Sequence, residues 1–363
     1  MDIPLRVAVI GTGMGRYHMQ DFVACPNVKL AAVCDLNREE AIHFAKEYGA
    51  ERVVTDYHDL WGIANLDAIS IAVPNFLHAQ IAIEALERGL HVYCEKPMAT
   101  TLADARKMVE TARAQHKRLM IGMSQRFKAE NLALHGLVER GELGEIYYAR
   151  ATWIRRRGVP VIHFSATGSM GRGEWFVDRE KAGAGALFDI GVHMFDLTWW
   201  LMGNPKPLTV SAVSYRNLWT DEFARRGIKY DVDELSSAFV RFENGATAVF
   251  DVSWAANQDN EMNVRIFGTR AGLQVYPPKL FSEPRWGELH TDTVEIKEIG
   301  EGLNPRRHFI DCIRHPDAPM IASGEECLTV MAVLDAVQRS AATGREVDVA
   351  DVIPAGGIGA TAS

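Results

Sequence analysis

Cysteine is scarce in this sequence, and its placement does not suggest a disulfide framework or a metal site. The five cysteines stand at positions 25, 34, 94, 312 and 327, and no two form a Cys-x-x-Cys pair. An odd, scattered set is typical of reduced thiols in a cytosolic protein. The His-Glu-x-x-His pattern of zinc enzymes is also missing. We therefore predict a cytoplasmic protein with no metal site.

The sequence also lacks an excess of basic residues and any long apolar run. Lys and Arg number 39 against 47 Asp and Glu, a net charge of −8. This balance leaves no broad basic surface for nucleic acid or an anionic membrane. No run approaches the roughly 20 apolar residues that span a bilayer, and no signal peptide precedes the first strand. We expect a small-molecule partner, with no nucleic acid and no membrane.

What the sequence does contain is a two-part pattern of strands and helices. Strands alternate with helices over residues 1–124, which predicts right-handed βαβ units and a doubly wound parallel α/β sheet. From 125 to 352, consecutive strands at short spacing predict an α+β domain with a mostly antiparallel sheet. Its last helices are expected to be able to pack back on the first domain. Residues 353–363 are small and Gly-rich, and we predict a flexible tail.

A glycine-rich turn follows the first predicted strand, residues 5–10. It contains Gly11, Gly13 and Gly15 and leads directly into a helical segment. Glycines in such a turn permit close backbone approach, and the helix N-terminus receives a pyrophosphate. The usual dinucleotide motif would place its third glycine at position 16, where Arg16 stands. The pattern therefore predicts a dinucleotide site with an altered pyrophosphate turn.

An acidic residue, Asp35, ends the second predicted strand about twenty residues beyond the glycines. In dinucleotide sites a carboxylate here binds the adenosine ribose hydroxyls and repels a 2′-phosphate. We therefore predict NAD, with NADP less favoured, although Arg38 close by could soften this preference. The alternative is that Asp35 caps the helix of residues 37–48.

A second candidate site residue ends the strand that begins at His91. This strand runs into Glu95, Lys96 and Pro97. Ligands of open α/β sheets bind beyond the carboxyl ends of strands, so Lys96 is predicted to face the crevice. The alternative is a strand that ends in an ordinary charged turn.

The predicted helix at residues 187–202 carries a third candidate group. Asp189 and His193 are four residues apart, so they share one face of the helix. His193 can take a proton near neutral pH, although a lone buried histidine is more often structural. We interpret the set as a dehydrogenase site. His193 removes a hydroxyl proton, Lys96 stabilises the alkoxide, and Asp189 orients the donor hydroxyls or the imidazole.

Taken together, these motifs resemble those of the glucose–fructose oxidoreductase/inositol dehydrogenase/MocA (Gfo/Idh/MocA) family along nearly the whole chain. The resemblance rests on Gly11-Thr12-Gly13 with His18, Val73-Pro74-Asn75 with His78, Glu95-Lys96-Pro97, Arg126, the run Asp189/Gly191/His193/Asp196, and Gly324-Glu325-Glu326. It implies a Rossmann domain followed by an open-faced sheet, an NAD(P) cofactor and a sugar or cyclitol substrate. It also implies Lys96 and His193 as catalytic residues, Asp189 as a relay or substrate ligand, and a cis peptide before Pro97. Dimers or tetramers formed through the open sheet are a further expectation.

The cofactor set predicted in this way lies at strand ends of the first domain. It comprises Gly11, Thr12, Gly13, Met14, Gly15, Asp35, Leu36, Arg38, Val73, Pro74, Asn75, His78, Glu95 and Lys96.

The segment before the catalytic helix is the candidate for substrate recognition. Arg155 and Arg157 share a face if the strand predicted at residues 146–157 is continuous, and they could bind acidic groups or hydroxyls. Trp175 could stack on a sugar face. The predicted substrate ligands are Lys96, Arg126, Arg155, Arg157, His163, Trp175, Asp189 and His193. The alternative is a solvated or subunit-facing charge run.

We therefore expect an NAD-dependent dehydrogenase that acts on CH–OH groups of a sugar, glycoside or cyclitol. The Arg-Arg-Arg-Gly-Val-Pro stretch at residues 155–160 resembles the sugar and glycoside branch of the family and points to C3 of a glucose-type ring. The alternatives are an inositol dehydrogenase, an oxidoreductase that passes hydride between two sugars through tightly bound NAD(H), and a non-catalytic NAD-binding regulator.

Overall fold

The chain folds into two units, and the first is built from two separate stretches of sequence. The computed structural model describes residues 3–158, 173–294 and 302–349. The first unit comprises the described residues up to Ser124 together with Leu303–Leu328. The second comprises Gln125–Gly302 and the chain from Thr329 onward. No helix within the described ranges is long and apolar enough to cross a membrane.

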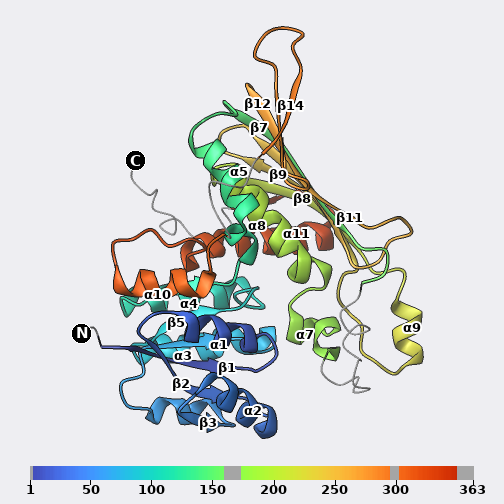
Figure 1. Cartoon of the computed structure of the whole chain (residues 1–363). Helices are drawn as coiled ribbons and strands as arrows, with labels where there is room; N and C mark the ends of the chain where they lie inside the picture. Colours follow the sequence, from blue (N-terminus) through green and yellow to red (C-terminus); the bar gives the residue numbers. More distant parts are fainter. Residues whose placement is uncertain (1–2, 159–172, 295–301, 350–363) are drawn as a thin grey trace. The chain divides into compact units, whose positions relative to one another are not determined.

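A six-stranded parallel sheet forms the centre of the first unit (Figure 1). Its strand order is β3-β2-β1-β4-β5-β6. The strands are β1 (Leu5–Ile10), β2 (Val28–Cys34), β3 (Arg52–Val54), β4 (Ala68–Ile71), β5 (His91–Cys94) and β6 (Leu119–Ile121). Runs of buried residues, such as all four of β4, are typical of a parallel sheet that is covered on both faces. The predicted doubly wound sheet is confirmed.

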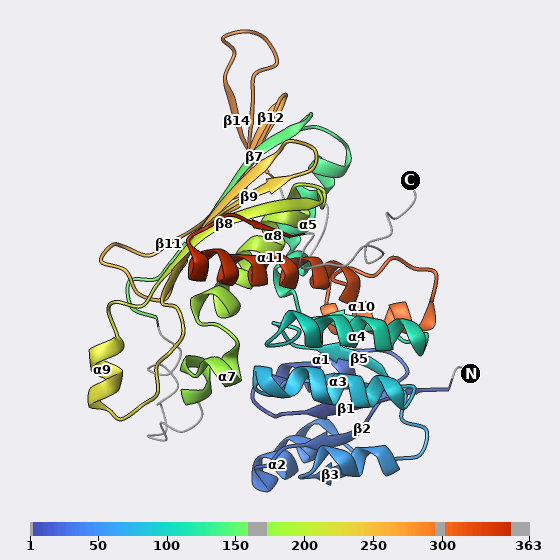
Figure 2. The same ribbon diagram turned by 180° about the vertical axis from the view of Figure 1, so that it is seen from behind.

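Helices cover both faces of this sheet. They are α1 (Gly15–Ala24), α2 (Arg38–Tyr48), α3 (His78–Glu87), α4 (Leu102–Ala114) and α10 (Pro305–Arg314), with single turns η1 (Tyr57–Gly62) and η2 (Asn75–Leu77). Helices α3 and α4 pack side by side on one face (Figure 2). Helix α10 packs against α1 and β5, so a late segment of the chain completes the first unit.

The second unit is a nine-stranded mixed sheet with helices on one face. Its order is β14-β13-β12-β11-β7-β10-β9-β8-β15. The strands are β7 (Ile146–Ile154), β8 (Pro207–Tyr215), β9 (Leu235–Phe242), β10 (Thr247–Ser253), β11 (Glu261–Gly268), β12 (Ala271–Gln274), β13 (Lys279–Ser282), β14 (His290–Thr293) and β15 (Val347–Asp348). Strands β10 and β7 pair in parallel, while the other printed pairs of this sheet are antiparallel.

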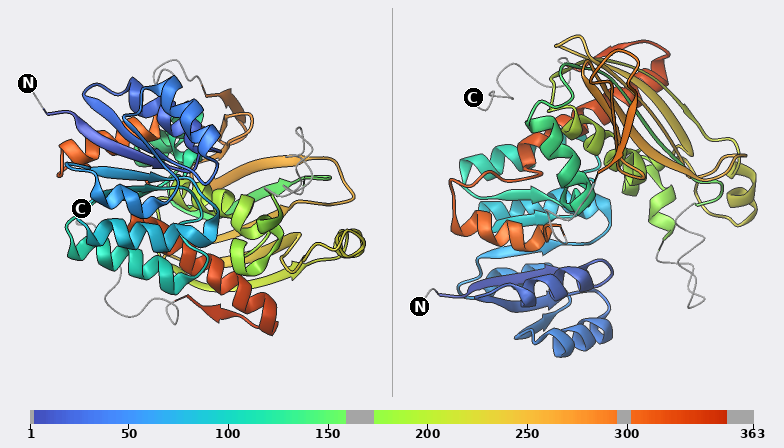
Figure 3. Two further views of the ribbon diagram at one scale, coloured as in Figure 1. Left: turned by 90° about the horizontal axis from the view of Figure 1, so that it is seen from below. Right: turned by 45° about the horizontal axis from the view of Figure 1, so that its top comes forward.

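The helices of the second unit are shorter, apart from the last. They are α5 (Ala129–Glu139), α7 (Arg179–Ala182), α8 (Val192–Leu201), α9 (Thr220–Arg225) and α11 (Gly324–Thr343), with turns η3 (Ser124–Phe127), η6 (Glu174–Val177) and η7 (Leu187–Gly191). Helix α8 packs on β7, β10 and β11 and is buried along its whole length (Figure 3). Strands β9 and β10 alternate buried and half-exposed residues, so their other face carries no helix of the described part.

The structure departs from the sequence-based expectation at several elements. The strand expected at residues 146–157 ends at Ile154. Strands β13, β14 and β15 and the short helices α7 and α9 were not predicted, because short segments with polar residues carry a weak periodic signal. The boundary at residue 124 agrees with the unit boundary, whereas Leu303–Leu328 belongs to the first unit and not to the predicted 125–352 domain. Residues 353–363 lie outside the described residues.

Candidate active site

The candidate cofactor residues follow the carboxyl ends of neighbouring parallel strands. Gly11–Gly15 follow β1, Asp35 follows β2, Val73–Asn75 follow β4, and Glu95 and Lys96 follow β5. Strand order reverses between β1 and β4, the point at which ligands of such sheets bind. The first unit therefore brings these predicted residues to one edge of its sheet.

The three glycines of the first loop have different physical roles. Gly11 has φ +90°, and a Cβ atom there would lie 2.3 Å from the Ala72 carbonyl oxygen. A Cβ at Gly15 would lie 2.9 Å from Val9 Cγ1, so Gly15 lets α1 pack closely on β1. At Gly13 no protein atom comes within 4 Å of such a Cβ.

This arrangement answers the question raised by the early third glycine. Close helix–strand packing is the role of the third glycine in the usual motif, and Gly15 performs it one residue early. Helix α1 starts at Gly15 and has no acidic residue in its first turn. Its N-terminus and the open space over Gly13 fit the pyrophosphate of a dinucleotide.

Asp35 is hydrogen-bonded to the glycine loop as well as to its own turn. Its Oδ2 accepts hydrogen bonds from the Thr12 backbone N–H at 2.7 Å and the Thr12 hydroxyl at 2.6 Å. Its Oδ1 accepts one from the Asn37 N–H at 2.8 Å. The alternative that Asp35 caps the following helix was wrong, because the cap of α2 is Asn37, which accepts from Glu40 N–H. A carboxylate offers about four acceptor positions, so Asp35 retains capacity for a ribose hydroxyl.

The other predicted contacts of the adenosine half lie in the same region. Leu36 exposes 91 % and Met14 54 % of its surface, unusual values for apolar side chains at a strand edge. Arg38 begins α2 and is exposed. These positions fit the predicted cofactor set.

The loop that carries Lys96 is fixed by a buried polar network. The Lys96–Pro97 peptide bond is cis, which confirms the expectation from the family resemblance. Glu95 contacts His18 Nε2 at 3.0 Å, and His18 Nδ1 contacts the Ser70 hydroxyl at 2.8 Å. Burial alone would raise the pKa of Glu95, but His18, Lys96 and Arg306 outweigh it and lower the pKa to about 2. Glu95 was predicted to bind the cofactor; its contacts here join α1 to the Lys96 loop.

His78 joins two of the candidate cofactor loops. It is 1 % exposed, with Nδ1 at 2.8 Å from the Pro97 carbonyl oxygen and Nε2 at 2.8 Å from the Val73 carbonyl oxygen. Burial lowers the pKa of His78, although both carbonyls favour its protonated form. These contacts favour a positioning role for His78 over direct cofactor binding. Asn75 is also buried, whereas Val73 and Pro74 are partly exposed.

Asp189 and His193 lie at the start of a buried helix of the second unit. Asp189 falls within the π-helical turn η7, and His193 in the first turn of α8. The side chain of Asp189 is 16 % exposed, and His193 is 9 % exposed. Isolated π-helical turns occur frequently at functional sites. The sequence spacing therefore placed both residues on one helical segment, without indicating the wider turn.

The N-terminus of this segment is held by Asp233, which the sequence did not single out. Its carboxylate accepts hydrogen bonds from the N–H groups of Gly185 at 2.7 Å and Leu187 at 2.8 Å, and from the Ser236 hydroxyl at 3.0 Å. A Cβ at Gly185 would lie 2.0 Å from the Asp233 carbonyl oxygen. These contacts fix where the segment with Asp189 and His193 begins, and a carboxylate there also favours the helix dipole.

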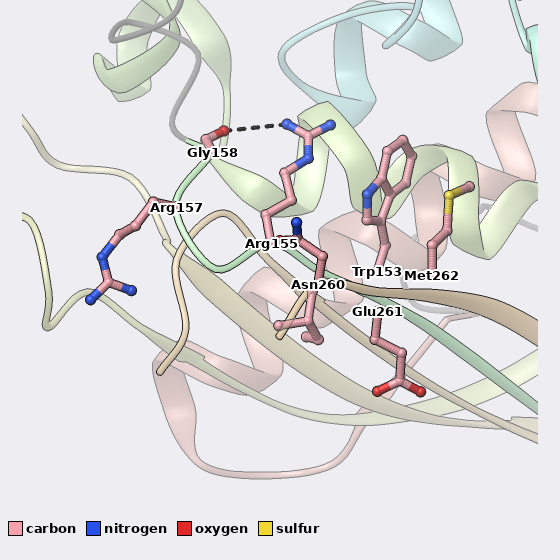
Figure 4. Close-up of a pocket in the computed structure, with 8 residues that line it drawn as sticks. Trp153, Arg155, Arg157, Gly158, Asn260, Glu261 and Met262 are labelled. Atoms are coloured by element: carbon pink, nitrogen blue, oxygen red, sulfur yellow. Dashed lines mark hydrogen bonds between the residues drawn. The ribbon is translucent and has the colours of Figure 1, made fainter. Parts of the chain in front are cut away.

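A pocket of about 560 Å³ in the second unit is lined from the ends of β7 and β11. Its lining residues are Trp153, Ile154, Arg155, Arg157, Gly158, Asn260, Glu261 and Met262. Figure 4 shows Trp153 and Met262 side by side, with Arg155 directed toward Gly158. The Trp153 ring lies 6.4 Å from the His193 ring, and Arg155 Nη1 lies 3.7 Å from Asp189 Oδ2. The pocket is therefore next to the predicted catalytic pair.

The predicted pairing of Arg155 with Arg157 was wrong. Because β7 ends at Ile154, the alternation of a strand does not continue, and the Arg157 side chain points away from Arg155 (Figure 4). Arg157 donates to the Ala256 carbonyl and to the Asn257 side chain. Arg155 instead lies over the Trp153 ring at 4.9 Å.

The remaining predicted substrate residues have varied surroundings. Trp175 stacks on Phe176 at 3.8 Å and is not part of the pocket lining. The aromatic surface beside Asp189 and His193 is provided by Trp153. His163 lies outside the described residues.

Arg126 lies in the core of the second unit. Its side chain and that of Asp196 are both 0 % exposed, and their charged groups pair at 2.7 Å. The guanidinium also lies 5.9 Å from the Trp199 ring and 5.7 Å from the Trp200 ring. This environment favours a structural role for Arg126 over contact with substrate.

The geometry defines a class of protein: a dinucleotide-binding parallel sheet, linked to a second unit with a carboxylate and an imidazole beside an aromatic pocket. Across the described residues, His, Cys, Asp and Glu form no group of three suited to a metal ion.

Comparison with known proteins identifies the family. Residues 5–123 match the oxidoreductase family with an NAD-binding Rossmann fold, and residues 131–274 match the GFO/IDH/MocA C-terminal domain. The chain belongs to the Gfo/Idh/MocA family of oxidoreductases, and its first unit is an NAD-binding domain.

Individual relatives agree with this assignment. The chain is 32 % identical over 356 residues to the D-glucoside 3-dehydrogenase of Escherichia coli (strain K12), covering 95 % of this chain and 98 % of the relative. A levoglucosan dehydrogenase in complex with NADH superposes with a TM-score of 0.79 at 25 % identity, covering 95 % and 99 % of the two chains. An aldose–aldose oxidoreductase from Caulobacter crescentus, complexed with glycerol, gives a TM-score of 0.77 at 25 % identity, with the same coverage.

Proposed function

We propose that this protein oxidises a secondary hydroxyl of a neutral sugar or glycoside, at C3 of a glucose-type ring, with NAD as hydride acceptor. The observation that carries the proposal is the 32 % identity with a D-glucoside 3-dehydrogenase over almost the full length of both chains. The pocket beside Asp189 and His193 supports it, since Trp153 offers a flat apolar surface of the kind that packs on a sugar ring.

The charges in the pocket favour a neutral substrate. The positive charge of Arg155 faces the carboxylate of Asp189 at 3.7 Å, so it is balanced within the protein. A phosphate or carboxylate on the substrate would compete with Asp189 for Arg155 and would place negative charge near that carboxylate. Hydroxyl groups can instead accept from Arg155 and donate to Asp189.

We assign the proton chemistry to three residues. His193 accepts the proton of the reacting hydroxyl, and the Lys96 ammonium stabilises the negative charge that develops on its oxygen. Asp189 orients the imidazole or the donor hydroxyls. The bound nicotinamide ring supplies the carbon that accepts the hydride. Support comes from the position of Lys96 beyond strand β5 and from the common helical segment of Asp189 and His193.

The experiment is an absorbance assay for NADH with methyl glucosides, glucose and myo-inositol as substrates. We expect turnover with glucosides and identification of the product as a 3-keto sugar by mass spectrometry and NMR. Lys96→Ala and His193→Ala should each lower kcat by at least about 100-fold and retain NAD binding in a calorimetric titration. Turnover of inositol alone, or full activity of either variant, would refute the assignment.

A second candidate is an oxidoreductase that passes hydride between two sugars through a retained cofactor. The specific observation in its favour is the structural similarity to the aldose–aldose oxidoreductase. The purified protein would then carry NAD(H) after gel filtration and would convert a sugar pair without added NAD.

We further propose that the protein forms a homodimer or homotetramer through the outer face of the nine-stranded sheet. Half-exposed apolar residues on that face support this: Val213 is 45 % exposed, Tyr215 49 % and Phe267 37 %. Registers across β8, β9 and β10 place Val213 on the same face as Ser237 and Asp251, opposite the face that contains the buried residues.

A further inference from the structure

Trp254 occupies a fixed position at the end of strand β10. Its side chain is fully buried, at 0 % exposure. Its backbone N–H donates to the Glu234 carbonyl at 2.8 Å, and its carbonyl accepts from the Gly158 N–H at 2.7 Å. The peptide groups on both sides are thus held by other segments, so the indole ring has little freedom to move.

The indole N–H of Trp254 donates a hydrogen bond to Asp189 Oδ2 at 2.9 Å. The same oxygen lies 3.7 Å from Arg155 Nη1. Two donors from different parts of the fold therefore converge on one carboxylate oxygen. Hydrogen bonds to an ionised group are roughly twice as strong as those between neutral groups, so the indole restrains the carboxylate effectively.

The chemistry of indole limits what Trp254 can do. Its N–H donates only, and it neither accepts a hydrogen bond nor exchanges its proton at physiological pH. Trp254 therefore cannot act as an acid, a base or a relay. What it can do is hold one oxygen of Asp189 in a fixed direction.

Arg155 restrains the same carboxylate from the pocket side. Its guanidinium lies over the Trp153 ring at 4.9 Å and donates to the Gly158 carbonyl at 3.3 Å. Gly158 is also the residue whose N–H binds the Trp254 carbonyl. The two donors to Asp189 are thus connected through one short segment.

We propose that Trp254 is a positioning residue for the dehydrogenase reaction, and that it acts by holding the Asp189 carboxylate in the orientation needed beside His193. This inference rests on the proposed function, because it assigns a role to Asp189 in turnover. It adds a residue that the sequence pattern does not indicate, since Trp254 lies 65 positions from Asp189 along the chain.

The competing interpretation is that Trp254 only fills the core and that its N–H binds the nearest acceptor. A comparison of variants separates the two. Trp254→Phe removes the N–H and keeps an aromatic ring. Trp199→Phe is a matched control, because its indole N–H donates to the Pro205 carbonyl at 2.8 Å and not to Asp189.

We expect Trp254→Phe to lower kcat/KM for the sugar by about 10- to 100-fold, the usual effect of losing a hydrogen bond to a charged group. The affinity for NAD should remain unchanged. Trp199→Phe should stay within about threefold of the wild type. In an Asp189→Asn background, Trp254→Phe should change kcat/KM by less than about threefold, because the group through which it acts has been altered.

Equal fold-losses from Trp254→Phe in both backgrounds would overturn the inference, as would full activity of the single variant. If the wild type oxidises no sugar, the proposed function fails and the inference with it. If the wild type is active and Trp254→Phe matches it, the inference alone fails.

A second measurement covers the case in which Trp254→Phe does not fold. The protein has eight tryptophans, and labelling their indole nitrogens with ¹⁵N gives a small set of N–H signals for NMR. Asp189→Asn should shift one of these signals strongly, and methyl glucoside should shift the same signal in the wild type. If neither addition of the sugar nor Asp189→Asn moves a common signal, Trp254 does not act through Asp189.

Discussion

Asp35 shows how one carboxylate can serve both the apoprotein and the cofactor. Its contacts with Thr12 and Asn37 hold it between the glycine loop and helix α2. We expect Asp35→Ser to lower the ratio of kcat/KM for NAD to that for NADP by at least about tenfold, because the negative charge that repels a 2′-phosphate is lost. Steady-state assays with both cofactors measure this ratio. Asp59→Ser, on the exposed turn η1, is the control, and an unchanged ratio in Asp35→Ser would contradict the ribose assignment.

Glu95 predicts a specific dependence of stability on pH. Its pKa is about 2 in the folded protein and near 4.5 in the unfolded chain, so the folded state favours the ionised form. The stabilisation, on the order of 3 kcal/mol, is present above about pH 4.5 and is lost as the pH falls toward 2. Urea unfolding at several pH values measures it. In Glu95→Gln the free energy of unfolding should fall less between pH 5 and 3 than in the wild type; parallel curves would show that Glu95 contributes nothing.

The limits of prediction from sequence are clearest for single residues. Lys96 was predicted because the end of a parallel strand is a local signal, and Asp189 with His193 because helical spacing is local too. Arg157 was assigned incorrectly because the end of β7 depends on the Asn260 side chain and on the neighbouring strand β10. Trp254 and Asp233 were missed because their contacts with the catalytic helix join segments far apart along the chain.

At the scale of elements, helix α1 and strand β1 provide a matched pair of glycines. Gly15→Ala places a Cβ 2.9 Å from Val9 Cγ1, and we expect a loss of about 1–3 kcal/mol in the free energy of unfolding. Gly13→Ala meets no protein atom within 4 Å, so stability should change little while NAD affinity falls. Thermal unfolding and calorimetric titration with NAD measure the two effects. Similar NAD affinity in wild type and Gly13→Ala would place the pyrophosphate elsewhere.

Strong periodic elements were predicted well and irregular ones poorly. The strands and helices of the parallel sheet have continuous apolar runs or clear helical spacing, and all six strands were anticipated. Strand β14 is fully exposed, and β15 has only two residues, so neither has an apolar pattern to detect. The π-helical turn of η7 leaves no distinct mark in the sequence, because it depends on packing against β10.

At the scale of the whole molecule, the first unit depends on a helix that comes late in the chain. Arg306 of α10 donates to Asp21 at 2.7 Å and to the Tyr93 hydroxyl at 3.3 Å, and its side chain is 14 % exposed. Arg306→Leu should lower the free energy of unfolding by about 3 kcal/mol, because a largely buried Asp21 loses its partner. Arg307→Leu, an exposed neighbour in the same helix, is the control. Chemical denaturation compares them, and equal stabilities would show that this ion pair is unimportant.

Assembly is the second property of the whole molecule that can be tested. If the outer face of the nine-stranded sheet joins subunits, light scattering after gel filtration will give twice or four times 40.3 kDa. Tyr215→Asp, at a half-exposed position of that face, should reduce this mass. A monomeric wild type would contradict the proposal. The predicted cytoplasmic localisation stays a prediction, to be tested by cell fractionation.

The discontinuous first unit has a consequence for synthesis on the ribosome. Polypeptides emerge from the N-terminus and begin to fold domain by domain. Here the strands of the NAD-binding sheet emerge first, but α10 is translated only after nearly two hundred further residues. The nascent sheet must therefore wait, with the surface that α10 will cover still open to solvent or to chaperones. The domain that starts first is completed only when translation is almost over.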